Sequence, residues 1–267
     1  MGNIISGTDF TGRLGPVSVY KMRGHDKLVI RTPGGASKSR IKNHRNFKAT
    51  RSLNQEWKLV TGVAKEIRQG LSALGQLSDY NVSGPLNALV KKIQTSDTTN
   101  EKGKRSILFS RYPDFISSFQ FNRQTLFDSI VRQQLDVNID KLSAIAKITV
   151  PVLQPAIHFF PNPRYAYYRW AIDIAAASDQ VWDEESKSFK PLAFLLPKYR
   201  HFYSAWVPAS STQPSATYEI SPFYAEFSSG PNMILIAGAG IQYGMPAPDG
   251  SIQPVPYAGA ARILKCV

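Results

Sequence analysis

The sequence contains a single cysteine, Cys266, and no apolar run that approaches the roughly 18 residues needed by a membrane-spanning helix. One thiol cannot form an internal disulfide or a thiolate zinc site, so we expect neither. The first six residues also lack the charged region and the continuous apolar region of a secretory signal. We therefore expect a protein that acts in the cytoplasm or within an assembled particle.

Recognisable catalytic motifs are missing as well. The sequence has no GxSxG, HExxH or P-loop pattern, and none of His25, His44, His158 and His201 has a partner at metal-ligand spacing. A metal site or a serine triad would have to be assembled wholly from residues that are distant in the sequence. We accordingly predict no catalytic residue, no cofactor and no metal, in a protein that is not an enzyme.

One glycine pattern superficially resembles a dinucleotide-binding turn. Residues 233–237 are typical of a strand, and GxGxxxG follows over residues 238–244. Pyrophosphate binding needs a helix that begins at the glycines, and Pro246 and Pro248 leave no room for one. We interpret this segment as a strand whose glycines allow a neighbouring sheet to approach closely.

Acidic residues are scarce near the N-terminus. The chain has 32 basic and 19 acidic residues, and the whole excess of +13 lies in residues 1–111, because residues 112–267 hold twelve of each. Residues 31–51 contain seven basic residues, one histidine and no acid. Such a run is a solvated segment that attracts anions. The residues expected to contact a polyanion or a neighbouring subunit are Arg31, Lys38, Arg40, Lys42, Arg45, Lys48 and Arg51.

The N-terminal residues 1–32 have the pattern of a β-hairpin. Residues 17–22 and 28–30 are β-rich runs, and the connection between them contains a glycine and an Asx residue. Residues 33–38 have turn chemistry without an apolar period, so we predict an extended basic arm over residues 33–51. Gly2 and Ser6 fit the N-myristoylation pattern, and without that acyl group we expect no membrane anchor.

The strongest local pattern lies in residues 52–111, which we expect to form a helical segment. Seven apolar residues spaced 4, 3, 4, 3, 4, 3 predict an amphipathic helix over residues 53–74, with Ser52 and Gln55 as a capping box. A weaker pattern predicts a second helix over residues 85–94, capped by Ser83, and thus an αα-hairpin. The stripe expected to form the helix interface comprises Leu53, Trp57, Val60, Ala64, Ile67, Leu71 and Leu74.

Proline is rare in the first half of the chain and frequent in the second. Fourteen of the 18 prolines lie between Pro151 and Pro256, where they would interrupt almost any long helix. Short period-two runs separated by turns fill residues 112–267, and these predict an immunoglobulin-like β-sandwich or a pair of small ones. The expected strands are 119–121, 135–139, 145–152, 157–160, 165–174, 193–196, 203–207, 217–220, 224–227, 233–242 and 257–266, while 126–131 fits a helical turn or a strand.

The strand expected over residues 165–174 is rich in aromatic side chains. Alternation along a strand would place Tyr168, Trp170, Ile172 and Ile174 in a core, with Tyr165, Tyr167 and Arg169 on the other face. The alternative interpretation is a platform on which bases or sugars stack. We favour the structural interpretation.

Two stretches resemble a known family. These are Gly12-Arg-Leu-Gly15-Pro-Val-Ser-Val-Tyr20 continuing to Val29-Ile-Arg31, and Gly238-Ala-Gly240-Ile-Gln-Tyr-Gly244 with Tyr257-Ala-Gly-Ala-Ala-Arg-Ile263. Together they resemble an uncharacterised family that is abundant in Bacteroidetes. The resemblance implies a bacterial protein with immunoglobulin-like β-structure behind an N-terminal hairpin, and it implies no established activity.

The functional expectation rests on the basic arm. Our leading hypothesis is a structural or assembly protein, a homo-oligomer or part of a larger assembly, whose arm contacts neighbouring subunits or a polyanion. The alternative is a protein that binds nucleic acid through residues 31–51 without sequence preference. A third hypothesis is a carbohydrate-active sandwich that uses Asp173, Asp179 or Glu219, which would require paired carboxylates in one cleft.

Overall fold

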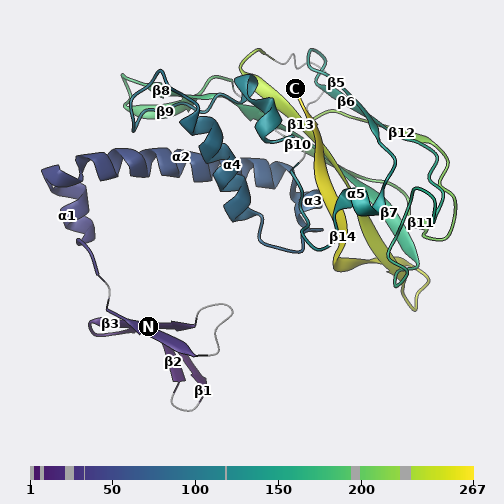
Figure 1. The fold of residues 1–267 in the computed structure, drawn as a ribbon, viewed down its shortest axis with the longest axis horizontal. Coiled ribbons are helices and arrows are strands. Elements are labelled where there is room, and N and C mark those ends of the chain that lie inside the picture. Colours follow the sequence, from purple (N-terminus) through teal and green to yellow (C-terminus); the bar gives the residue numbers. More distant parts are fainter. Residues whose placement is uncertain are drawn as a thin grey trace. The chain divides into compact units, whose positions relative to one another are not determined.

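The computed structural model describes residues 3–6, 9–21, 27–32, 34–117, 119–193, 199–222 and 230–267. The chain divides into two compact units, residues 1–51 and residues 52–267 (Figure 1). The division falls where the sequence predicts the end of the basic arm. The predicted helical segment and the β-rich part belong to one unit.

A four-stranded antiparallel sheet makes up most of the N-terminal unit. Its strands follow the order of the sequence, and Gly15 has a left-handed φ of 56° that permits the tight turn between the second and third strands. The predicted hairpin is present as the last two strands, and its turn, residues 22–26, lies outside the described residues. The strands are β1 (Asn3–Ser6), β2 (Asp9–Leu14), β3 (Val17–Lys21) and β4 (Leu28–Arg31).

The prediction of an extended arm over residues 33–51 is wrong. This segment contains the helix α1 (Lys38–Asn43), a 3-10 helix (Arg45–Phe47) and the beginning of α2 (Lys48–Gly70). These short helices bury no side chain, so no apolar period marks them in the sequence.

Hydrogen bonds to the helix ends explain why this segment is helical. The Ser37 hydroxyl accepts a hydrogen bond from the backbone N–H of Arg40 at 3.2 Å and caps the start of α1. At the other end, Arg51 donates to the carbonyls of Ile41 at 2.8 Å and His44 at 2.9 Å. Both ends of α1 are therefore satisfied by side chains that a hydrophobic pattern does not detect.

The predicted helical hairpin is present with shifted boundaries. Because α2 begins at Lys48, Ser52 lies inside the helix and does not cap it. The helix breaks at Leu71 and resumes as α3 (Ser72–Gly75), whereas the sequence predicts one continuous helix over residues 53–74. The second helix, α4 (Ser83–Thr95), contains Ser83 as its first residue, and it crosses α2 (Figure 1).

Two β-sheets form the body of residues 52–267. The large sheet has the antiparallel order β10-β7-β13-β14, and β11 pairs with β7. Its strands are β7 (Tyr167–Ser178), β10 (Tyr199–Tyr203), β11 (Val207–Pro208), β13 (Met233–Pro246) and β14 (Ile252–Cys266). The smaller sheet has the order β12-β6-β5, with β5 (Asp136–Asp140), β6 (Ile145–Val150) and β12 (Ala216–Ile220), and a separate hairpin pairs β8 (Gln180–Asp183) with β9 (Ser188–Pro191).

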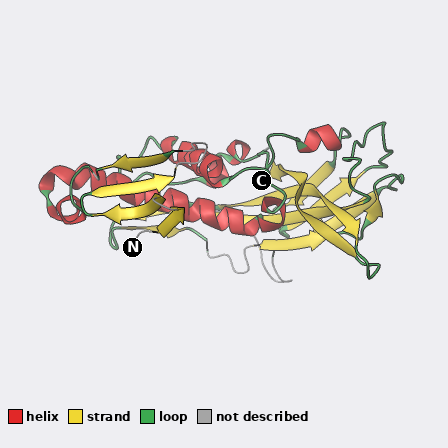
Figure 2. Ribbon diagram, turned by 90° about the horizontal axis from the view of Figure 1, so that it is seen from below, coloured by secondary structure: helices red, strands yellow, loops and turns green. Residues whose placement is uncertain are grey.

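The large sheet is buried on both faces. Alternate residues of β7, including Tyr168 and Trp170, share a core with Ile148 of the smaller sheet. The intervening residues, such as Ala171 and Ala175, share a second core with the helices. The unit therefore has three layers, in which the helices, the large sheet and the smaller sheet follow one another. Figure 2 shows the helices in red and the strands in yellow.

The mainly β fold class is confirmed, and the immunoglobulin-like arrangement stays a prediction. Tyr168, Trp170, Ile172 and Ile174 are fully buried, as the alternation predicts. What the sequence did not predict is the helical layer over the opposite face of the sheet. That layer packs on the small side chains of β7, and a run of alanines carries no periodic signal.

Several strand predictions are wrong. Residues 119–121 and 157–160 form isolated bridges in place of strands. Residues 126–131, expected as a helical turn or a strand, contain the helical turn α5 (Phe127–Ile130). Residues 203–207 span the end of β10 and the start of β11. Residues 194–196 and 224–227 lie outside the described residues. Two further 3-10 helices, Phe109–Arg111 and Pro113–Phe115, precede this region.

The glycine-rich segment is a strand, as predicted, and its glycines allow a close approach. A Cβ at Gly238 would lie 2.5 Å from Cδ1 of Leu74, and one at Gly240 would lie 2.7 Å from Cδ1 of Leu77. The approaching element is therefore the α3 segment, together with the adjacent strand β14, and not a neighbouring sheet as the sequence suggested. Side chains at these positions would push α3 away from the large sheet.

Candidate functional site

The N-terminal sheet has one apolar face and one polar face. Leu14 opposes Val17 across the β2–β3 pair, and Val19 opposes Ile30 across the β3–β4 pair. Because side chains alternate along a strand, these four lie on one face. The opposite face carries Arg13, Ser18, Tyr20 and Arg31, since Ser18 opposes both arginines.

Within its own unit, the apolar face of the N-terminal sheet is largely uncovered. Among the side chains of this unit that the structure describes, only Val19 is buried. Leu14 is 61% exposed and Ile30 is 67% exposed. Exposed apolar side chains that share one face of a sheet are typical of an interaction surface, so this face has the character of a docking surface.

The seven basic residues predicted as contacts are not equivalent. Arg51 is half-buried and holds the end of α1, whereas the other six are exposed. Within the described part of the chain, no acidic side chain forms an ion pair with Arg31, Lys38, Arg40, Lys42 or Arg45. With eleven basic and two acidic residues, the N-terminal unit carries a net charge of +9.

The predicted helix interface divides into a buried part and an exposed part. Val60, Ala64, Ile67, Leu71 and Leu74 are buried in the core beneath the large sheet. Leu53 and Trp57, which begin the same stripe, are 44% and 49% exposed. The apolar stripe of α2 thus continues beyond its own core, onto the surface.

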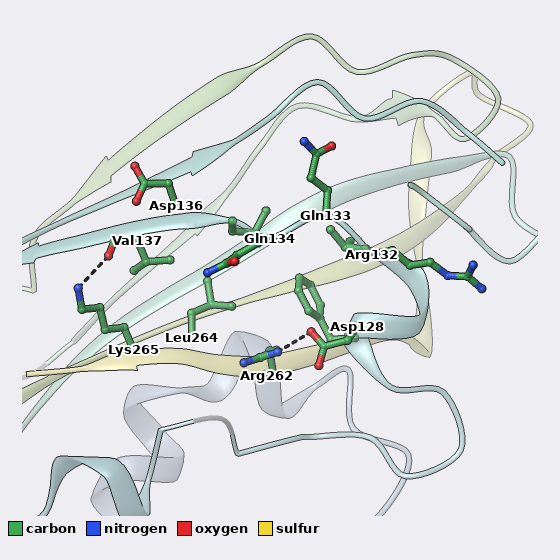
Figure 3. Close-up of a pocket in the computed structure, with 12 residues that line it drawn as sticks. Asp128, Arg132, Gln133, Gln134, Asp136, Val137, Arg262, Leu264 and Lys265 are labelled. Carbon is green, nitrogen blue, oxygen red and sulfur yellow. Dashed lines mark hydrogen bonds and ion pairs between the residues drawn. The ribbon is translucent and has the colours of Figure 1, made fainter. Parts of the chain in front are cut away.

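A groove of about 800 Å³ separates the β14 edge from the segment that joins α5 to β5 (Figure 3). Arg262 pairs with Asp128 at 2.5 Å, and Lys265 donates to the carbonyl of Val137 at 3.1 Å, so charged side chains already connect the two walls. The groove offers binding space, but none of its lining residues is a serine, a threonine or a cysteine. The sequence did not predict it. Its lining residues are Phe127, Asp128, Val131, Arg132, Gln133, Gln134, Leu135, Asp136, Val137, Arg262, Leu264 and Lys265.

The three carboxylates considered for sugar chemistry do not form a pair. Asp179 is buried and accepts hydrogen bonds from the backbone and hydroxyl of Ser110. Six positions separate it from Asp173, which corresponds to roughly 20 Å along a strand, far beyond the separation of about 5–9.5 Å that glycosidases use. Glu219 lies on the smaller sheet and pairs with Lys147 at 3.3 Å.

Asp173 instead belongs to a buried network that the sequence did not predict. Its Oδ1 lies 2.7 Å from Nδ1 of His201, and Nε2 of that histidine lies 3.1 Å from the hydroxyl of Ser72. Burial raises the pKa of Asp173, and the hydrogen bond to Asp173 raises the pKa of His201. The sequence feature that could have indicated this network is Asp173 itself, a single carboxylate in a mainly apolar strand.

The described residues also bear on two other kinds of site, a metal centre and a membrane span. Within them, no cluster of three or more His, Cys, Asp or Glu side chains could hold a metal ion. None of the helices described has both the length and the apolar character needed to cross a membrane. Gly2 lies outside the described residues.

No protein-family model, curated protein or solved structure matches the chain significantly. The resemblance to the Bacteroidetes family therefore stays a prediction. The functional argument rests on the residues and their geometry.

Proposed function

We propose that this is a structural or assembly protein whose N-terminal unit docks on a neighbouring copy of the chain. The uncovered apolar face of the N-terminal sheet, with Leu14 and Ile30 at its surface, is the observation that carries the proposal. Burying an exposed Leu or Ile side chain contributes about 1.5–3 kcal/mol. Docking would therefore stabilise a sheet that buries a single described side chain of its own.

The body of the molecule offers an apolar surface that such a unit could cover. Leu53 and Trp57 extend the stripe of α2 beyond the core, and tryptophan is a frequent anchor of protein interfaces. In a homo-oligomer, each copy would provide the sheet face with Leu14 and Ile30 and also the exposed stripe with Leu53 and Trp57. This complementarity supports a homo-oligomer as the assembled form.

The double variant Leu14→Thr/Ile30→Thr is expected to have a lower oligomeric mass than the wild-type chain. Threonine favours strands, so the sheet is kept while its apolar surface is lost. Size-exclusion chromatography with light scattering measures the mass at several concentrations. The matched control is Val29→Thr, because Val29 opposes Tyr20 and lies on the other face of the same sheet. A mass that is unchanged in the double variant, or a wild-type monomer, would contradict the proposal.

A second candidate function is binding to nucleic acid without sequence preference. It is favoured by the exposed cations Arg40, Lys42 and Arg45, which no described acidic side chain pairs. A polyanion that neutralises such cations releases its counterions, which makes the affinity steeply salt-dependent.

Replacing these three residues with alanine is expected to reduce the slope of log K against log [salt] by about 3, because each phosphate contact contributes about 0.9. Fluorescence anisotropy with a labelled duplex at several salt concentrations measures this slope. The control variant replaces Lys58, Lys65 and Lys102, three exposed lysines of the body. If the affinity did not change with salt concentration, or if the triple variant and its control lost the same affinity, residues 31–51 would be excluded as the binding site.

A further inference from the structure

Three side chains from three separate segments meet beside the edge strand of the large sheet. Ser72 is the first residue of α3, Asp173 lies in the middle of β7, and His201 lies on β10. The β10–β7 register places His201 directly opposite Asp173. The histidine therefore lies between the carboxylate at 2.7 Å and the hydroxyl at 3.1 Å.

The break between α2 and α3 brings Ser72 to this position. A Cβ at Gly70 would lie 2.7 Å from Cβ of Ala175, so the absence of a side chain lets the end of α2 approach β7. The Oδ2 atom of Asp173 then accepts the backbone N–H of Leu74 at 3.1 Å and holds the start of α3. One carboxylate thus fixes both the histidine ring and the segment that carries the serine.

The environment of each group suits a distinct chemical role. Asp173 is fully buried, whereas the side chain of His201 is 29% exposed and Ser72 is half-buried. A buried carboxylate that accepts the Nδ1–H leaves Nε2 as the proton acceptor that faces the serine hydroxyl. The ring of Tyr199 lies 5.1 Å from that of His201 and restricts its rotation.

We propose that Ser72 is a nucleophile toward carboxylic esters, with His201 as its general base and Asp173 as the residue that orients the histidine. This activity goes beyond the proposed assembly function and beyond the sequence-based prediction of no catalytic residue. Asp173 is a positioning residue because it contacts the substrate at no step.

The reaction is balanced by an ester and water alone. The Ser72 oxygen forms a bond to the acyl carbon while its proton passes to Nε2 of His201, and the ester C–O bond breaks as that proton moves to the leaving alcohol. Water then attacks the acyl-serine, with His201 again taking a proton, and returns the free hydroxyl and a carboxylic acid.

The position of the three residues favours small, unhindered acyl groups. The edge strand β10 carries the histidine, whose side chain is 29% exposed, and Ser72 is half-buried. An acyl group would therefore approach the serine from the exposed side of the imidazole ring. We expect acetyl esters to react faster than esters of long-chain acids.

The test uses the full-length protein with p-nitrophenyl acetate and, separately, with a fluorophosphonate probe. We expect ester hydrolysis and a single covalent label, which peptide mass spectrometry locates on Ser72. Ser72→Ala should abolish both, and His201→Gln should lower both rates at least 100-fold, as loss of a general base does. Ser78→Ala is the matched control, because Ser78 lies six positions further along the chain and its hydroxyl donates to the carbonyl of Gly75 at 2.7 Å.

The pH dependence provides a readout that a purely structural network would not show. A histidine acts as a base only when neutral, so the labelling rate should rise with pH and reach half its maximum above the ordinary histidine value of 6.5. The described ionisable groups in contact with His201 are Asp173 and Tyr199, and Tyr203 interacts electrostatically with Asp173. An unlabelled wild type, a label elsewhere, or a label on Ser72 that forms equally fast in His201→Gln would overturn the proposal.

Discussion

Glu56→Ala is expected to lower the free energy of unfolding by about 3–5 kcal/mol, the cost of removing one partner from a buried ion pair. Glu56 is fully buried on α2 and binds Arg105 through Nη2 at 2.6 Å and Nε at 2.9 Å. It also accepts from Lys91 at 3.0 Å and from the backbone N–H of Gly103 at 2.7 Å. The substitution leaves all these donors without their acceptor.

Urea denaturation followed by circular dichroism measures this loss. The matched control is Glu219→Ala, which removes an exposed pair with Lys147 and is expected to cost less than about 1 kcal/mol. If the two variants lost similar amounts of unfolding free energy, the buried ion pair of Glu56 would contribute no more than the exposed pair of Glu219. That result would contradict the role of Glu56 in joining α2 to Lys91, Gly103 and Arg105.

The stabilisation from Glu56 should also disappear in acid. Burial raises the pKa of this carboxyl, but the hydrogen bonds from Arg105, Gly103 and Lys91 outweigh that effect and lower it to about 2. Because the folded pKa lies below the ordinary value of 4.5, the stabilisation is complete above that value and is lost as the pH falls toward 2. The difference between wild type and Glu56→Ala should therefore narrow over this interval.

Trp170→Ala is the second substitution with a large expected effect, about 3–5 kcal/mol. Trp170 is fully buried between the large and the smaller sheet, where its ring lies 6.2 Å from that of Phe127. Its Nε1–H donates to Oε1 of Gln213 at 2.9 Å, and the same oxygen accepts the Tyr168 hydroxyl at 2.6 Å. The substitution creates a cavity and removes a buried hydrogen bond.

Chemical denaturation again measures the effect, with Tyr257→Ala as an aromatic control. Tyr257 is 78% exposed, so its removal is expected to change the free energy of unfolding by no more than about 0.5 kcal/mol. A Trp170 variant as stable as the control would mean that β7 does not separate two cores. The three-layer arrangement would then be incorrect.

Local periodicity explains which elements the sequence predicts well. The stripe from Val60 to Leu74 and the alternation from Tyr168 to Ile174 each report one buried face, and both faces are buried in the structure. Leu53 and Trp57 continue the first stripe but are exposed, because a repeat shows which side of a helix is apolar and not how far the core extends. The helix α1 was missed since its ends depend on Ser37 and Arg51 and it buries nothing.

By itself, the sequence determined a basic N-terminal region, an amphipathic helix and a β-rich body, because charge and periodicity are properties of neighbouring residues. The tertiary structure alone decided that helices cover the second face of the large sheet and that residues 1–51 leave one apolar face of their own sheet uncovered. It also brought Ser72 to His201, which is 129 positions away. Contacts of that separation depend on strand register and on the close approach at Gly70, neither of which a local pattern encodes.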